Sequence, residues 1–358
     1  MDKQDKMVFR FHGDHTPALE KLALKLKETL EAHGYHYRWY SISPRLVLNF
    51  ITADEVKPYR RRAQATFVVS MLEASQSPQD PIKEWYPYLV RGLSNMLLVY
   101  IPNKEAHFLT LDLAHFIEPE GDRFYERLFE RIHPMASSVL VVNNRFEQDL
   151  EPELWQGDEL TRSLSEAGRK LGQWDLLPAA FPIDKILSAE DFRHVKRLYG
   201  IGGLSYGNLS VRQDHHRFWM SASGVDKSNL SEIGRDILLV KDYDATANAI
   251  VLSVPPNVEP RRVSVDAIEH WLIYKEYPEV GAIIHVHAWM QGVPTTIFHY
   301  PCGTYQLGQA VAEKVREGPD PASAVVGLKN HGLTITGRSL ADILDRIDGK
   351  LIKHVPMR

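Results

Sequence analysis

The sequence predicts an α/β protein with two domains. The chain has 358 residues, and at roughly 150 residues per domain this length favours two domains over one. Short apolar runs alternate with stretches of helical periodicity, as expected for a mixed α/β protein. An acidic and then helical stretch ends in the pair Pro178 and Pro182, which marks a linker. We therefore expect a mixed α/β domain over residues 1–150, a linker over 151–180 and a second domain over 181–358.

The first 150 residues carry strand and helix patterns but no spacing that indicates chemistry. Residues 7–11 predict a strand, and residues 16–33 predict an amphipathic helix that Gly34 ends. Helical stretches follow around 84–93 and 122–132. The apolar runs between and around them are YRWYSI, RLVLNFI, ATFVVSML, NMLLVYI, HFLTLDL and SSVLVV. One hypothesis for this domain is that it binds the substrate or a partner and contributes specificity.

Composition excludes several classes of protein. A net charge of -4 and a pI near 6.5 provide no basic field for holding nucleic acid. No apolar run approaches the roughly 20 residues that span a bilayer, and the N-terminus lacks an apolar export segment. With one cysteine, Cys302, the chain forms no internal disulfide. We therefore expect a cytoplasmic protein that binds neither nucleic acid nor membrane.

The segment VGAIIHVH, residues 280–287, predicts a buried strand that carries two histidines. The run is short, rich in β-branched residues and preceded by Pro278. Residues two apart in a strand point to the same side, so His285 and His287 present both imidazoles to one face. Converging imidazoles suit Zn, Fe, Co, Ni or Mn. An isolated H-x-H pair, however, is more often two ordinary strand histidines.

The segment before this strand, residues 264–278, predicts a helix with a carboxylate near its start. Its apolar residues cluster with helical spacing, and Ser264 is well placed to cap the helix. Asp266 lies in the first turn, and a tight turn joins the helix to the histidine strand. Helix and strand should therefore run back to back, which brings Asp266 to the metal edge as a fourth ligand or as a base. A carboxylate favoured only by the helix dipole is an equal alternative.

Polar and glycine-rich turns supply the remaining candidates. Residues 324–337 read as two strands joined by a tight turn that aims the imidazole of His331. Residues 199–212 are rich in glycine, and Ser223 and Gly224 form another polar turn. Glycines let backbone N–H groups approach an anion closely. The glycine spacing matches neither nucleotide-binding motif, and a plain tight turn accounts equally well for each loop.

Taken in order, these pieces resemble the class II aldolase/adducin family. The motifs G-N-L-S, S-G-V, a helix with H-x-x-x-Y followed by P, H-V-H and N-H-G succeed one another over about 181–358. The resemblance implies an α/β/α layered domain with a central, mostly antiparallel sheet in this half. It also implies a homo-oligomer, since related enzymes are usually tetramers. The N-terminal domain resembles no family whose function we can name.

The resemblance implies roles for eight residues. His285, His287 and His331 correspond to the three histidine ligands of a divalent metal, usually zinc, with Mn2+, Co2+ and Fe2+ as alternatives. Asp266 lies 19 residues before the first of them, where aldolases of the family place a catalytic glutamate and the epimerase branch an aspartate. The positions that bind substrate phosphate in the sugar-phosphate members correspond to Asn208, Ser223, Gly224 and Ser264.

The resemblance favours a metal-dependent lyase acting on a small molecule. Aldol cleavage, decarboxylation or dehydration of an oxygenated substrate, phosphorylated or not, would pass through a metal-stabilised enediolate. Candidate second acids, chosen by proximity in sequence, are Tyr300, Tyr305 and Lys329. Arg261 and Arg262 precede the helix and are candidates for holding a phosphate or carboxylate, with plain surface charge as the alternative.

Two other functions remain as alternatives. One is a non-catalytic, adducin-like binding or scaffold protein that retains the fold. The adducin branch lacks the metal histidines, so their presence favours the enzyme. The other is a sugar-phosphate epimerase. It is disfavoured because Ser221 stands where the epimerases have a lysine, and because the segment from His287 to Pro301 is short.

Overall fold

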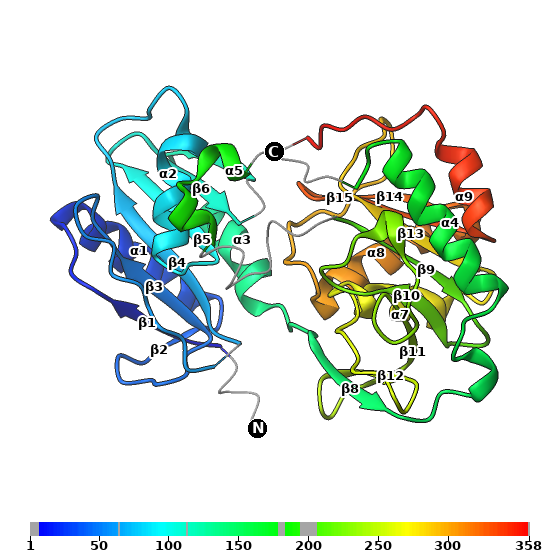
Figure 1. The fold of residues 1–358 in the computed structure, drawn as a ribbon. Helices are drawn as coiled ribbons and strands as arrows, with labels where there is room; N and C mark the ends of the chain where they lie inside the picture. The colour runs from blue at the N-terminus through cyan, green and yellow to red at the C-terminus, as the bar shows by residue number, and fades with distance from the viewer. Residues whose placement is uncertain (1–6, 64, 112–113, 178–182, 194–205, 357–358) are drawn as a thin grey trace. The chain divides into compact units, whose positions relative to one another are not determined.

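The computed structural model describes residues 7–63, 65–111, 114–177, 183–193 and 206–356 (Figure 1). Within these ranges the chain forms two compact units. The first comprises residues 7–137 and 183–193, and the second comprises residues 138–177 and 206–356. None of the helices in the described ranges combines the length and apolar content that a membrane crossing requires.

The first unit is built on a seven-stranded sheet with the order β2-β1-β3-β4-β5-β6-β7. The first five strands pair in parallel, and the last two pair antiparallel. The strands are β1 (Val8–His12), β2 (His36–Tyr37), β3 (Leu46–Phe50), β4 (Phe67–Glu73), β5 (Met96–Ile101), β6 (Glu105–Thr110) and β7 (His115–Pro119). Helices α1 (Pro17–Ala32) and α3 (Phe124–Ser137) pack on one face of the sheet, and α2 (Pro81–Arg91) and α5 (Ile183–Ile186) pack on the other.

Most elements predicted for this unit are present, and two apolar runs differ. The predicted first helix forms α1, which the side chain of Thr16 caps by accepting from the backbone N–H of Leu19. The run YRWYSI is mostly loop, and its side chains Trp39, Tyr40 and Ile42 are at least 64% exposed. SSVLVV is not a named strand, and β8 (Asn143–Glu147) follows it. Apolar composition alone does not make a strand, because a segment also needs a neighbouring strand with which it can pair.

The second unit contains an eight-stranded sheet with the order β14-β15-β13-β9-β10-β11-β12-β8. Neighbouring strands are antiparallel except for β12 and β8, which confirms the mostly antiparallel sheet. The strands after β8 are β9 (Asn208–Arg212), β10 (Phe218–Ser221), β11 (Ile237–Asp244), β12 (Ala249–Ser253), β13 (Ala282–Val286), β14 (Val325–Leu328) and β15 (Gly332–Gly337).

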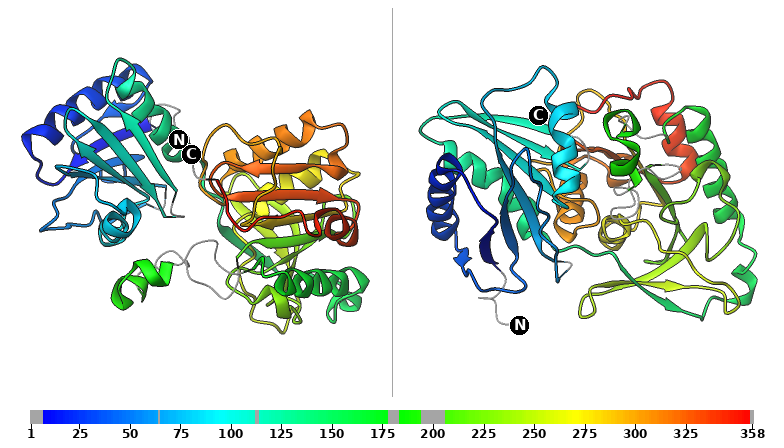
Figure 2. Two further views of the ribbon diagram at one scale, coloured as in Figure 1. Left: turned by 90° about the horizontal axis from the view of Figure 1, so that it is seen from above. Right: turned by 60° about the vertical axis from the view of Figure 1, so that its left-hand side comes forward.

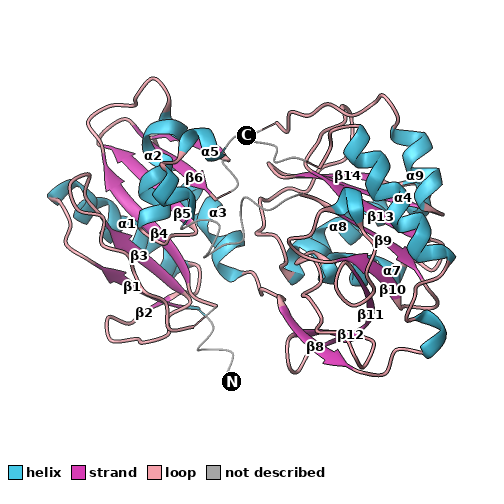
Figure 3. Ribbon diagram, viewed as in Figure 1, coloured by secondary structure: helices cyan, strands magenta, loops and turns pink. Residues whose placement is uncertain are grey.

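Helices cover both faces of this second sheet, as the layered arrangement requires (Figures 2 and 3). Helices α4 (Glu159–Gln173) and α9 (Leu340–Ile347) lie together on one face. Helices α7 (Ala267–Glu276) and α8 (Tyr305–Glu317) lie together on the other. Short 3-10 turns are η2 (Pro152–Leu154), η3 (Lys227–Asn229) and η4 (Pro321–Ser323).

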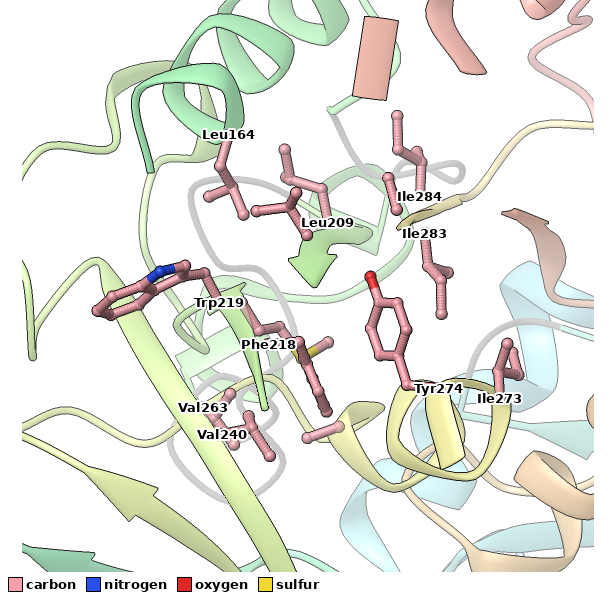
Figure 4. Close-up of a cluster of buried hydrophobic side chains, with 14 of the residues drawn as sticks. Leu164, Leu209, Phe218, Trp219, Val240, Val263, Ile273, Tyr274, Ile283 and Ile284 are labelled. Atoms are coloured by element: carbon pink, nitrogen blue, oxygen red, sulfur yellow. The ribbon is translucent and has the colours of Figure 1, made fainter. Parts of the chain in front are cut away.

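Residues 159–173, within the stretch 151–180 expected to form a linker, form a helix of the second unit. Asp158 and Thr161 form a reciprocal capping box at the start of α4. Leu164 then packs into the core of the unit beside Leu209 and Trp219 (Figure 4). An amphipathic helix must bury its apolar stripe against a partner, and here the sheet supplies that partner.

Helix α7 is tied to the sheet by one buried hydroxyl. Ser210 on β9 contacts Nδ1 of His270 at 2.7 Å and the hydroxyl of Tyr274 at 2.8 Å. The two partners are four residues apart, so they share one face of the helix. The ring of Tyr274 also packs 4.7 Å from that of Phe218 (Figure 4). The motif H-x-x-x-Y therefore fixes the rotation of α7, and with it the direction of Asp266 at its start.

Candidate metal centre

Two glycines allow the strands to close around the histidine strand. An added Cβ at Gly207 would lie 2.4 Å from the carbonyl oxygen of His285, and one at Gly332 would lie 2.3 Å from that of Val286. Gly207 also has a φ of +71°, in the left-handed region. The G-N and H-G motifs thus hold β9 and β15 against the end of β13, next to His287.

The structure brings His285, His287 and His331 together. His285 lies one residue before the end of β13, His287 follows the strand directly, and His331 lies in the turn between β14 and β15. The ring centroids are 5.1, 5.0 and 4.5 Å apart. One nitrogen from each ring lies within 4.8 Å of the other two. Two nitrogens bound to one tetrahedral zinc are about 3.4 Å apart, so small side-chain movements suffice to bind it.

The hydrogen-bonding state of the rings fits a divalent metal. Nδ1 of His285 donates to the carbonyl oxygen of Leu333 at 3.0 Å, which leaves Nε2 with its lone pair. In the described part of the chain, this Nε2 and Nδ1 of His287 are buried and have no hydrogen-bond partner. Buried polar atoms rarely remain unpaired in native proteins, and a cation would satisfy both.

The electrostatics of the site keep these imidazoles neutral. Burial, together with a smaller contribution from the neighbouring His331, lowers the pKa of His285 to about 3. Burial and the neighbouring imidazoles of His331 and His285 hold the pKa of His287 well below its ordinary value. A neutral imidazole is the form that binds a metal, so protons do not compete for these nitrogens near pH 7.

Asp266 lies beside the centre but outside the group of converging nitrogens. Its Oδ2 accepts from Nδ2 of Asn208 at 2.8 Å, and its Oδ1 accepts from the backbone N–H of Gly303 at 3.3 Å. Helix α7 begins at Ala267 with Asp266 as the N-cap residue. The expectation that Ser264 caps this helix was therefore wrong. The backbone N–H of Ser264 instead donates to the carbonyl oxygen of Ser221.

The predicted phosphate positions fall into two places. The exposed turn at Ser223 and Gly224 lies beside the segment that leads to Ser264, because Ser223 N–H donates to Arg262 O at 2.8 Å. Asn208 is instead buried and bonded to Asp266. The glycine-rich positions 199–205 lie outside the described residues.

The expected second acids and arginines have other contacts. Tyr305 begins α8, with its ring 6.0 Å from that of Tyr243. Tyr300 packs edge-on against Phe298, and the backbone N–H of Lys329 donates to Thr296 Oγ1. Both arginines are exposed, and Arg262 donates to the carbonyl oxygen of Val142 at 2.8 Å while the backbone N–H of Arg261 donates to Gly234 O.

Three residues near the histidines were missed by sequence reasoning. Lys227 is 3% exposed, and burial lowers its pKa to about 8 although the charge of Asp266 opposes this. Burial and the charge of Asp266 raise the pKa of Glu269, whose Oε1 accepts from Thr334 Oγ1 at 2.5 Å. Cys302 places its Sγ 3.2 Å from Nε2 of His331. A charged side chain gives no sequence signal of its own burial, so only tertiary packing reveals that Lys227 and Glu269 are buried.

Comparison with known proteins identifies relatives of part of the chain. The family described as Class II Aldolase and Adducin N-terminal domain matches residues 189–290. A methylthioribulose-1-phosphate dehydratase of Klebsiella pneumoniae is 32% identical over 176 residues, 40% of this chain and 79% of the relative. The enzyme of the same name from Citrobacter koseri is 29% identical over 172 residues, 40% of this chain and 78% of the relative. One from Stenotrophomonas maltophilia is 25% identical over 148 residues, which cover 39% of this chain and 61% of that protein.

Solved structures with detectable likeness carry related descriptions. L-fuculose-1-phosphate aldolase from Thermus thermophilus is 18% identical with a TM-score of 0.34, over 52% of this chain and 86% of that one. An aldolase II superfamily protein from Pseudomonas syringae is 15% identical with a TM-score of 0.36, over 56% and 73%. The Klebsiella pneumoniae relative is 32% identical and is matched over 79% of its own length, and the family match at residues 189–290 lies in the C-terminal half of the chain. The chain therefore belongs to the class II aldolase and adducin family, through its C-terminal half.

Proposed function

We propose that the second unit is a divalent-metal-dependent lyase. The observation that carries the proposal is the convergence of His285, His287 and His331, with buried nitrogens on the first two that lack hydrogen-bond partners among the described residues. When bound, a divalent cation supplies a Lewis acid that draws electron density from a substrate oxygen. Zinc suits three neutral imidazoles, with Co2+, Mn2+ and Fe2+ as alternatives.

The reaction we propose is dehydration of a small phosphorylated sugar derivative. The support is the name shared by relatives of 25 to 32% identity, methylthioribulose-1-phosphate dehydratase. Aldol cleavage and decarboxylation use the same cation and the same kind of base, so they remain outcomes of a substrate screen. Homo-oligomeric assembly and a role of the first unit in substrate or partner binding remain predictions from the sequence.

Asp266 is proposed as the base that takes the substrate proton. Its two carboxylate oxygens accept from Asn208 and Gly303, which fixes the group in one orientation. Each oxygen keeps a second lone pair for the proton. The substrate phosphate is assigned to the exposed turn at Ser223 and Gly224, beside Ser264, where hydroxyl donors are accessible.

Turnover by the purified full chain tests this function. Water loss from methylthioribulose-1-phosphate and from other phosphorylated sugars would be followed with the zinc-loaded protein and after chelation. We expect chelation to remove activity, readdition of zinc to restore it, and Asp266→Asn to lower kcat by about 10²- to 10⁴-fold. The exposed-residue variant His216→Ala is the matched control and should keep full activity.

Two results would contradict the proposal. Activity that persists after complete metal removal would exclude a metal-dependent reaction. A zinc-loaded protein that turns over none of these substrates would favour the binding or scaffold alternative.

A further inference from the structure

We infer that Glu269 is a positioning residue, which holds the base Asp266 beside the histidine centre through its hydrogen bond to Thr334; this inference rests on the proposed function. Oε1 of Glu269 accepts from Oγ1 of Thr334 at 2.5 Å. Both side chains are buried, with exposures of 1% and 0%.

Stability alone does not explain a glutamate at this place. Glutamate is almost never fully buried unless it is paired. Oε2 of Glu269 is buried and has no hydrogen-bond partner in the part of the chain that the structure describes. An unpaired buried oxygen costs stability, and an apolar side chain would avoid that cost. The bond that Oε1 makes is therefore the feature that needs a role.

Three neighbouring strands present a row of side chains to helix α7. In the antiparallel pairings, His285 on β13 lies opposite Asn208 on β9 and opposite Thr334 on β15. Residues directly opposite each other point to the same face of the sheet. Asp266 accepts from Asn208 at one end of this row. Glu269 accepts from Thr334 at the other end, so the two carboxyl groups flank the strand that carries His285.

The bond of Glu269 holds α7 from a second side. The contacts of Ser210 with α7, and the bond between Asn208 and Asp266, go to β9. Thr334 lies on β15, on the opposite side of β13. A helix held from both sides of β13 is prevented from tilting about β9. Asp266, at the start of the helix, therefore keeps its place relative to His285.

Close packing transmits the position of Glu269 to Asp266. An added Cβ at Gly308 on α8 would lie 3.0 Å from Cα of Glu269, so the two helices are in close contact at this point. The backbone N–H of Glu269 donates to the carbonyl oxygen of Asp266 at 3.0 Å. A shift of this turn would therefore move the base, and a misplacement of about 1 Å can cost about 10²-fold in rate.

A neutral side chain of the same shape should serve equally well in this role. Burial and the charge of Asp266 raise the pKa of Glu269, which favours its protonated form. The amide of glutamine is neutral, and its oxygen can accept from Thr334 in the same way. Glutamine at position 269 should therefore keep the bond, whereas methionine, which has a similar length, removes it.

Kinetics of four variants of the zinc-loaded full chain test the inference, with methylthioribulose-1-phosphate as the substrate. Glu269→Met and Thr334→Val each remove one partner of the bond, and the double variant removes both. We expect kcat to fall about 10- to 10²-fold in all three, with KM within about twofold of the wild-type value. The double variant should lose no more than either single variant, because the bond is already broken in each. Glu269→Gln should keep kcat within about twofold, because the amide retains the bond.

Two comparisons separate positioning from a loss of stability. Replacing both partners of a buried hydrogen bond by apolar groups of similar shape is nearly neutral for stability. The double variant should therefore resist urea nearly as well as the wild-type protein while its kcat stays low. The matched control is Thr336→Val: Thr336 is also 0% exposed and lies on the same face of β15, but its hydroxyl donates to the carbonyl oxygen of Pro321. This control should lower stability and leave kcat and zinc content unchanged.

Three results would count against the inference, and they are distinguishable. A double variant with wild-type kcat would overturn the positioning role and leave the proposed lyase intact. If Glu269→Gln were as slow as Glu269→Met, the carboxyl itself would take part in the reaction, and a role limited to positioning would be wrong. Absence of turnover by the wild-type protein would overturn the lyase and the positioning role together.

Discussion

Replacing His285 with alanine is expected to abolish stoichiometric metal binding. The side chain is 2% exposed, and its Nδ1 bond to Leu333 O directs Nε2 toward the other two rings. If three imidazoles share an apparent zinc binding free energy of roughly 12 kcal/mol, each contributes about 4 kcal/mol. Its loss should weaken binding about 10³-fold. Elemental analysis after dialysis should show about one equivalent for the wild-type protein and almost none for the variant.

A second buried histidine supplies the matched control. His270 is 0% exposed, and burial lowers its pKa to about 3, as it does for His285. It bonds to Ser210 rather than pointing into the histidine cluster. His270→Ala should therefore lower stability but keep about one metal per chain. Equal metal content in His285→Ala and the wild-type protein would show that His285 is not a ligand.

Gly207→Ala is expected to destabilise the second unit strongly. The added Cβ would lie 2.4 Å from the carbonyl oxygen of His285, a backbone atom that cannot move away cheaply. Overpacking of this kind costs about 1–3 kcal/mol, and a φ of +71° adds about 1–2 kcal/mol for a residue with a Cβ. We expect a total loss of about 3 kcal/mol in the free energy of unfolding, measured by urea denaturation, together with weaker metal binding because His285 is displaced.

Substitutions at two other glycines separate the cost of the steric contact from the cost of the positive φ. Gly224 has a φ of +73° and no heavy atom within 4 Å of an added Cβ, so Gly224→Ala should cost only about 1 kcal/mol. At Gly332 the contact with Val286 O dominates, so Gly332→Ala should cost about 1–3 kcal/mol. If Gly207→Ala and Gly224→Ala destabilised the protein equally, the close approach of β9 to β13 would have no energetic weight.

Local patterns in the sequence predict many of the strands and turns of the second unit. The β-branched run before His285 forms β13, and the turn chemistry around His331 joins β14 to β15. These elements depend on near neighbours in the chain, which periodicity and turn residues report. The structure shows in addition that the imidazoles of His285, His287 and His331 converge. This convergence depends on the antiparallel pairing of β13 with β15.

Local patterns could not predict which distant strands pair or which charged side chains are buried. Strand β8 joins the second sheet because it pairs in parallel with β12, which nothing in its polar sequence NNRFE indicates. Glu269 and Lys227 look like surface charges in sequence, yet both are almost fully buried. Cys302 was read only as evidence of a reducing compartment, and its contact with His331 arises from a loop fixed by Asp266.

X-ray absorption spectroscopy of the zinc-loaded full chain is the most direct test of a metal held by His285, His287 and His331. We expect imidazole scattering from three nitrogen donors at about 2.0–2.1 Å, reduced in His285→Ala and in His331→Ala. A spectrum fitted without imidazole scattering, and unchanged by either substitution, would place the zinc elsewhere and contradict the histidine centre.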